Sequence, residues 1–183
     1  MGAGGPLCAA VLVVSIAAPA RAAESGHRPT LAIQVQNVAG LETARADDAR
    51  DEVTRALRAA GVDVEWTWGT PPAAAPALQI VLANGKAPTG SAIDADLALG
   101  YAVSDAGRAY VFVDRILAHT RTTHANPNVV LAQVMTHEIG HLLLGPGGHS
   151  EIGVMRPHFD ASFFGYSRFT REQSAAIRAR LAR

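Results

Sequence analysis

The sequence predicts an α+β domain in which helices pack against a mixed, mainly parallel and twisted β-sheet. Short runs of alternating apolar and polar residues, typical of half-buried strands, recur in the first two thirds of the chain. A segment with helical periodicity separates the first two runs, and a long apolar helical segment follows the last. This order of elements is typical of helices layered on a sheet.

The first half of the chain contains three predicted strands and one amphipathic helix. Residues 31–36 and 62–68 alternate apolar and polar side chains. Between them, residues 41–60 place alanine, valine and leucine at helical spacing, and Gly61 ends the helix. Residues 78–82, Leu-Gln-Ile-Val-Leu, are more continuously apolar, which favours a central strand.

A hairpin and a buried helix are predicted next. Residues 97–103 and 108–114 read as two strands joined by a tight turn. Asn126 and Pro127 are suited to the N-cap and first turn of a helix. From residue 129 to 144 apolar side chains surround the helix axis almost completely, so the helix is expected to be buried on most sides.

The chain leaves this helix abruptly. Residues 145–148, Gly-Pro-Gly-Gly, cannot continue it, because glycine favours other backbone conformations and proline lacks the N–H group. Residues 170–173, Thr-Arg-Glu-Gln, form a capping box and predict a last helix that ends near residue 182.

The first 22 residues have the pattern of a secretory signal peptide. Residues 7–18 are apolar, and Ala20-Arg21-Ala22 offers small residues at a cleavage site. The apolar run is shorter than the roughly 20 residues of a membrane span. We therefore expect a secreted or periplasmic protein, with residues 23–183 as a single domain. Its only cysteine, Cys8, would leave with the signal peptide, so the mature domain would have no disulfide.

Charge excludes some partners. The formal net charge is zero and no long run of either sign occurs, so neither nucleic acid nor an anionic membrane is expected as a partner.

Polar residues inside the buried helix indicate a metal site. His137 and His141 are one turn apart on the same side of the helix and can share one zinc ion at about 2.0–2.1 Å. Glu138, in the same HExxH motif, is placed to take a proton from a zinc-bound water that attacks a carbonyl group. A catalytic zinc needs a third protein ligand, and His149 follows the glycine-rich break.

Other residues remain open for these roles. Glu151, His158 and Asp160 are alternatives to His149 as third ligand, because their side chains also bind zinc. Tyr166 and His158 are candidates to stabilise the oxyanion of a tetrahedral intermediate, although packing or surface positions explain them as well.

The motif resembles the metzincin clan of zinc metallopeptidases, and most of all its matrixin-type pattern. HExxH, a helix-ending glycine, a third histidine followed by serine, and the downstream Met155 carry the resemblance. The motif here reads HExxHxxxGxxxH instead of HExxHxxGxxH, so Leu144 stands at the usual glycine position and His149 comes two residues late. The resemblance implies a zincin-like fold and an apolar floor at Met155. It also implies that residues 97–103 form an antiparallel edge strand that binds an extended peptide.

These observations predict a secreted zinc-dependent metalloendopeptidase (a hydrolase) with one catalytic Zn²⁺ ion. His137, His141 and His149 would bind the ion, Glu138 would activate the water, and a peptide or protein would be the substrate. The alternative is an exported, inactive metal- or peptide-binding homologue of the same fold. A pure binding site does not need Glu138, and this favours the enzyme. Hydrolysis of a substrate other than a peptide is a third possibility, because HExxH defines the machinery and not the substrate.

Overall fold

The computed structural model describes residues 1, 28–69, 78–85, 98–145, 147–157 and 168–183. The predicted signal peptide, Met1 excepted, lies outside this described part of the chain. No helix within the described ranges is both long enough and apolar enough to cross a membrane.

Within the described ranges, five strands form one mixed sheet in the order β2-β1-β3-β5-β4. Four neighbouring strands are parallel, and β4 pairs antiparallel with β5 at one edge. The strands are β1 (Thr30–Asn37), β2 (Asp63–Trp68), β3 (Leu78–Ala83), β4 (Gly100–Val103) and β5 (Arg108–Phe112). The prediction of a mainly parallel sheet with an antiparallel edge strand is confirmed, as is the central place of β3.

The edge strand is shorter than the sequence predicted. It begins at Gly100, residues 98 and 99 precede it without strand structure, and residue 97 lies outside the described ranges. A short 3₁₀ turn, Ser104–Ala106, joins it to β5 and ends at Gly107, whose φ of 59° suits glycine.

Four α-helices accompany the sheet in the described residues. They are α1 (Thr43–Ala59), α2 (Val113–Thr123), α3 (Pro127–Leu144) and α4 (Arg171–Leu181). The predictions for α1, α3 and α4 are confirmed, with ends that differ by a few residues. The extension of β5 to residue 114 is wrong, because the chain turns into α2 at Val113.

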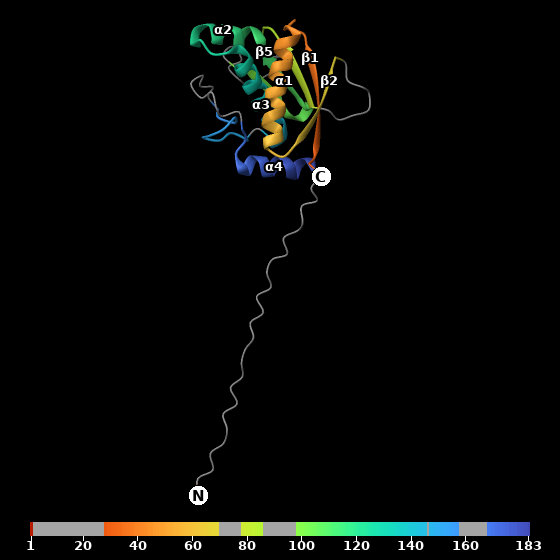
Figure 1. Cartoon of the computed structure of the whole chain (residues 1–183), viewed down its shortest axis with the longest axis vertical. Helices are drawn as coiled ribbons and strands as arrows, with labels where there is room; N and C mark the ends of the chain where they lie inside the picture. Colours follow the sequence, from red (N-terminus) through yellow and green to blue (C-terminus); the bar gives the residue numbers. More distant parts are fainter. Residues whose placement is uncertain (2–27, 70–77, 86–97, 146, 158–167) are drawn as a thin grey trace.

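Helix α3 lies at the centre of the core. Its apolar residues, such as Leu131, Met135 and Ile139, join one buried cluster with α1 and with the inward side chains of the sheet. It contacts α1, α2 and α4, and Figure 1 shows α1 and α3 side by side, with α2 near one end and α4 near the other. Because these contacts surround α3, the helix backbone is held in one position, and so are the few side chains that the neighbouring elements do not cover.

The opposite face of the sheet carries a row of hydrogen-bonded polar side chains. Gln34 of β1 accepts a hydrogen bond from Gln79 of β3 at 3.0 Å, and Arg108 of β5 donates to Gln79. Gln34 in turn donates to the Gly69 carbonyl. Gln34 and Gln79 are both buried, so these bonds satisfy polar groups that would otherwise be costly to remove from water.

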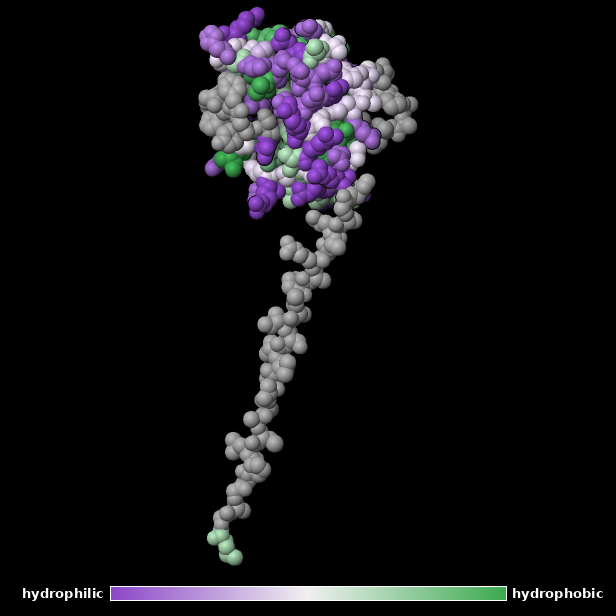
Figure 2. All heavy atoms as spheres, in the orientation of Figure 1, coloured by the Kyte–Doolittle hydropathy of each residue, from purple (hydrophilic) through white to green (hydrophobic). Residues whose placement is uncertain are grey.

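The outer face of α1 is hydrophilic. Its buried positions are alanine, valine and leucine, whereas charged residues occupy most of the others. The hydrophilic colouring spreads over this face in Figure 2. Ion pairs such as Arg50–Asp47, at 3.0 Å, are partly exposed and contribute little to stability.

Gly140 allows the closest approach to α3. A Cβ atom at this position would overlap the sulfur of Met155 and come within 3.0 Å of the Phe169 ring. Met155 is fully buried and Phe169 nearly so. The segments that follow α3 therefore pack directly on its backbone, between the turns that carry His137 and His141.

We predict that Gly140→Ala destabilises the protein by about 1–3 kcal/mol, because the buried methionine has no room to move away. In an open helix the same change is stabilising by up to about 1 kcal/mol, so the sign of the effect tests the packing. Gly147→Ala is the matched control, since an added Cβ there meets no described atom. Urea unfolding measures both; a stabilised Gly140→Ala protein would contradict this packing.

Candidate metal centre

Two of the three predicted ligands lie on one side of α3. Asn126 caps the helix by accepting a hydrogen bond from the Asn128 N–H at 2.9 Å, and Pro127 is its first residue. From this start the helix places the Nε2 atoms of His137 and His141 3.0 Å apart. Two nitrogen ligands of one tetrahedral zinc ion lie about 3.3 Å apart, so this spacing is near what a shared ion requires.

The glycine-rich break brings His149 back to this pair. Gly145 ends α3 with a φ of 86°, and its N–H donates to the His141 carbonyl at 2.9 Å. The His149 ring centroid then lies 4.6 Å from that of His141 and 5.3 Å from that of His137. Ligand atoms of all three histidines lie within 4.8 Å of one another.

Of the other proposed ligands, the described residues include only Glu151, and it does not join this group. Glu151 is exposed and is not among the three clustered residues. His158, Asp160 and Tyr166 lie outside the described residues. Among the described residues, His149 is therefore the one candidate third ligand that meets His137 and His141.

Backbone carbonyls fix the orientation of two imidazole rings. His137 Nδ1 lies 2.8 Å from the Val154 carbonyl oxygen, and His141 Nδ1 lies 3.5 Å from that of Gly145, a longer contact. A carbonyl only accepts hydrogen bonds, so Nδ1 carries the proton and Nε2 presents a lone pair. Two lone pairs that face each other repel, and a shared cation removes this repulsion. The donor set therefore fits a metal ion.

Burial keeps the histidines in the form that binds metal. It is the main cause that lowers the pKa of His137 to about 4, and the neighbouring rings of His141 and His149 act in the same direction. Burial also lowers the pKa of His141. Both imidazoles are thus neutral at neutral pH, as ligation requires.

Glu138 is the buried carboxyl group of the site. Its side chain is 6% exposed, and burial raises its pKa to about 8 in the metal-free protein. The backbone of β4 lies against it, because a Cβ atom at Gly100 would come within 2.6 Å of Glu138 Oε1. The edge strand and the carboxyl group are therefore direct neighbours.

The chain after His149 forms a turn beneath α3. The Ser150 N–H donates to the Met155 carbonyl at 3.0 Å, and the Val154 N–H donates to the Arg168 carbonyl at 2.9 Å. The backbone of Val154 thus contacts His137 through its carbonyl and, through its N–H, the segment that precedes α4. The sequence does not indicate these positions of Val154 and Gly100, because they depend on the path of the backbone and not on side-chain type.

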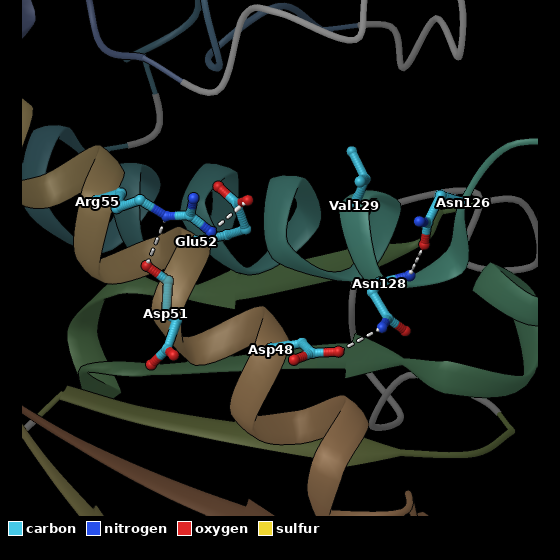
Figure 3. A pocket seen from close by; sticks show the side chains of 7 residues that line it. All are labelled: Asp48, Asp51, Glu52, Arg55, Asn126, Asn128 and Val129. Carbon is cyan, nitrogen blue, oxygen red and sulfur yellow. Dashed lines mark hydrogen bonds and ion pairs between the residues drawn. The ribbon is translucent and has the colours of Figure 1, made fainter.

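A separate pocket of about 250 Å³ lies between α1 and the start of α3 (Figure 3). Asn128 donates to Asp48 at 2.8 Å across it, and Arg55 pairs with Glu52 at its rim. None of the clustered histidines lines this pocket. Its polar contacts join the two helices and hold the start of α3 in place.

The sequence matches no protein-family model and no curated protein. The structure is similar to a zinc-dependent peptidase from Methanocorpusculum labreanum, with a TM-score of 0.58 and 15% identity over 79% of this chain and 99% of that one. It is also similar to an archaemetzincin from Methanopyrus kandleri, with a TM-score of 0.59 and 16% identity over 87% and 98% of the two chains. The chain thus has the fold of these proteins, a zincin-like α+β fold.

The buried carboxyl group of Glu138 should make the stability of the metal-free protein depend on pH. Between pH 4.5 and about 8 the folded state retains a proton that the unfolded state has released, so Glu138 lowers stability as pH rises through this window. We expect Glu138→Gln to be more stable than wild type by on the order of 3 kcal/mol at pH 8.5 and by far less at pH 4.5. Urea unfolding in the presence of a chelator measures this difference. A difference that does not change with pH would show that the carboxyl group is not buried in this way.

Proposed function

We propose that this protein is a zinc-dependent metallopeptidase. The observation that carries the proposal is the convergence of three imidazole rings, two of them with Nε2 lone pairs directed to one point, beside the buried carboxyl group of Glu138. Three histidines with one open position form a common catalytic zinc site. The fold shared with a zinc-dependent peptidase and with an archaemetzincin adds support.

Each residue of the site would have a distinct role in hydrolysis. A zinc ion on His137, His141 and His149 would act as a Lewis acid that activates water and polarises the scissile carbonyl. Glu138 would accept the proton of the attacking water and pass it to the leaving amine. Met155, buried against Gly140, would form the apolar floor beneath the histidines.

The edge strand β4 would bind the substrate as an extended peptide. Only β5 pairs with β4 among the described strands, so the other edge of β4 has backbone groups free of the sheet ladder. A peptide that adds to this edge forms backbone hydrogen bonds without requiring one side-chain sequence. Because Gly100 touches Glu138, such a peptide would pass next to the carboxyl group, as internal cleavage requires.

We predict that Glu138→Gln lowers peptide hydrolysis at least about 10³-fold, because the proton acceptor is lost. Zinc content should remain near one ion per chain in this variant and fall in His149→Ala. Digestion of a peptide library at neutral pH and metal analysis of the same samples measure both quantities. If the wild-type protein binds zinc but shows no hydrolysis that depends on Glu138, it is instead a metal- or peptide-binding homologue. Hydrolysis that proceeds without zinc would refute the proposal.

We further propose that the protein is exported and that cleavage follows Ala22. The apolar run at residues 7–18 and the small residues at 20 and 22 support this. Expression of the full chain in a bacterial host with an active secretion pathway should give a mature protein that begins at Ala23, as read by amino-terminal sequencing. A cytoplasmic product that retains Met1 would contradict export.

A further inference from the structure

One side chain of α4 contacts the chain on both sides of His149. Gln173 Nε2 donates to the Gly148 carbonyl at 2.9 Å and to the Ser150 hydroxyl at 3.0 Å. Gly148 and Ser150 are the two neighbours of His149 in the sequence. The Gln173 amide therefore spans the residue that carries the third imidazole.

The capping of α4 does not account for these two bonds. Gln173 Oε1 accepts from the Thr170 N–H at 3.0 Å, and the Gln173 N–H donates to Thr170 Oγ1 at 3.2 Å, which completes the capping box. Glutamate serves equally well at this position of a capping box, and its charge is favourable at a helix N-terminus. What glutamine adds is the Nε2 group, and the two bonds it makes both reach the segment around His149.

His149 needs such a restraint more than the other two histidines. His137 and His141 project from a buried helix, whereas His149 is exposed and follows Gly145, Gly147 and Gly148. Glycine loses more backbone freedom on ordering than any other residue, so an unrestrained segment here would weaken a ligand.

The restraint continues into the turn beneath α3. The Ser150 hydroxyl that accepts from Gln173 donates to the Ile152 carbonyl at 2.7 Å, and the Ser150 N–H donates to the Met155 carbonyl. The start of α4 thus holds the His149 segment as one hydrogen-bonded unit.

We propose that Gln173 is a positioning residue of the metal centre, which holds His149 in place through the Gly148 carbonyl and the Ser150 hydroxyl. This inference rests on the proposed zinc site at the three histidines. It assigns to α4 a role in ligand geometry in addition to its role in packing.

Zinc affinity of the metal-free chain, measured by competition with a chromogenic chelator, tests the proposal without any activity assay. Gln173→Glu keeps the acceptor of the capping box and removes the Nε2 donors, and Gln173→Met removes them without adding charge. We expect each variant to bind zinc about 10- to 100-fold more weakly than wild type, the usual effect of losing an outer-shell partner.

Thr170→Ala is the matched control. It breaks the same cap by removing the Thr170 hydroxyl, yet it leaves the Nε2 bonds of Gln173 in place. We expect a lower midpoint of thermal unfolding but a zinc affinity within about three-fold of wild type.

A double-mutant cycle shows whether Gln173 acts through His149. His149→Ala alone should weaken zinc binding strongly. Glu151→Ala is its control and should not, because Glu151 is exposed and lies outside the histidine cluster. In the His149→Ala background, Gln173→Met should cause no further loss beyond about two-fold, because the ligand that it positions is already absent.

The outcomes separate this inference from the proposed function. Wild-type affinity in both Gln173 variants would overturn the positioning role while leaving the zinc site intact. The inference would also be overturned if Thr170→Ala weakened zinc binding as much as the Gln173 variants do. The same holds if Gln173→Met weakened zinc binding by its full amount, about 10- to 100-fold, in the His149→Ala background. Either result would assign the effect to general stability. A wild-type chain that binds no zinc would refute the proposed function, and this inference with it.

Discussion

The burial of α3 is the constraint on which the rest of the structure depends. The helix is apolar on almost every side, so the sheet and three other helices enclose it. The same helix carries two imidazoles and a carboxyl group, which must remain beside a route to solvent. Glycines allow this close packing at two points, since Gly140 lets Met155 pack onto the helix and Gly100 lets the edge strand lie against Glu138.

This enclosure also sets the charge of the cluster. Loss of water is the largest cause that lowers the pKa of His137 and raises the pKa of Glu138, because it disfavours whichever form is charged. In the metal-free protein at neutral pH these side chains are therefore largely uncharged. A neutral cluster is compatible with the apolar residues around it, and so the domain can fold around the histidines without an ion pair to compensate them.

Local periodicity was enough to predict most elements, and the exceptions have physical reasons. Strands β1 to β3 and helices α1, α3 and α4 each follow from the spacing of their own apolar residues or caps. Helix α2 also has buried residues at helical spacing, Val113, Ile116 and Thr120, but no side chain caps it and it begins directly after Phe112, the last residue of β5, so the sequence predicts its start as a continuation of that strand. Two candidate ligands came from one helical motif, and the glycine break pointed to the third candidate. The contacts of Gln173 and Val154 join segments distant in sequence, so no local pattern contains them; the capping box identified Gln173 only as a helix start.

The row of Gln34, Gln79 and Arg108 has a consequence for how the sheet assembles. Parallel strands can pair in several alignments, and side chains alternate between faces, so a slip by one residue exchanges the two faces of a strand. A slip of β3 would turn Gln79 toward the apolar core and expel Ile80, which is fully buried in the native pairing. It would also leave Gln34 and Arg108 without their partner. The polar row therefore penalises misaligned pairing, and it gives the central strands a single acceptable alignment before any metal binds.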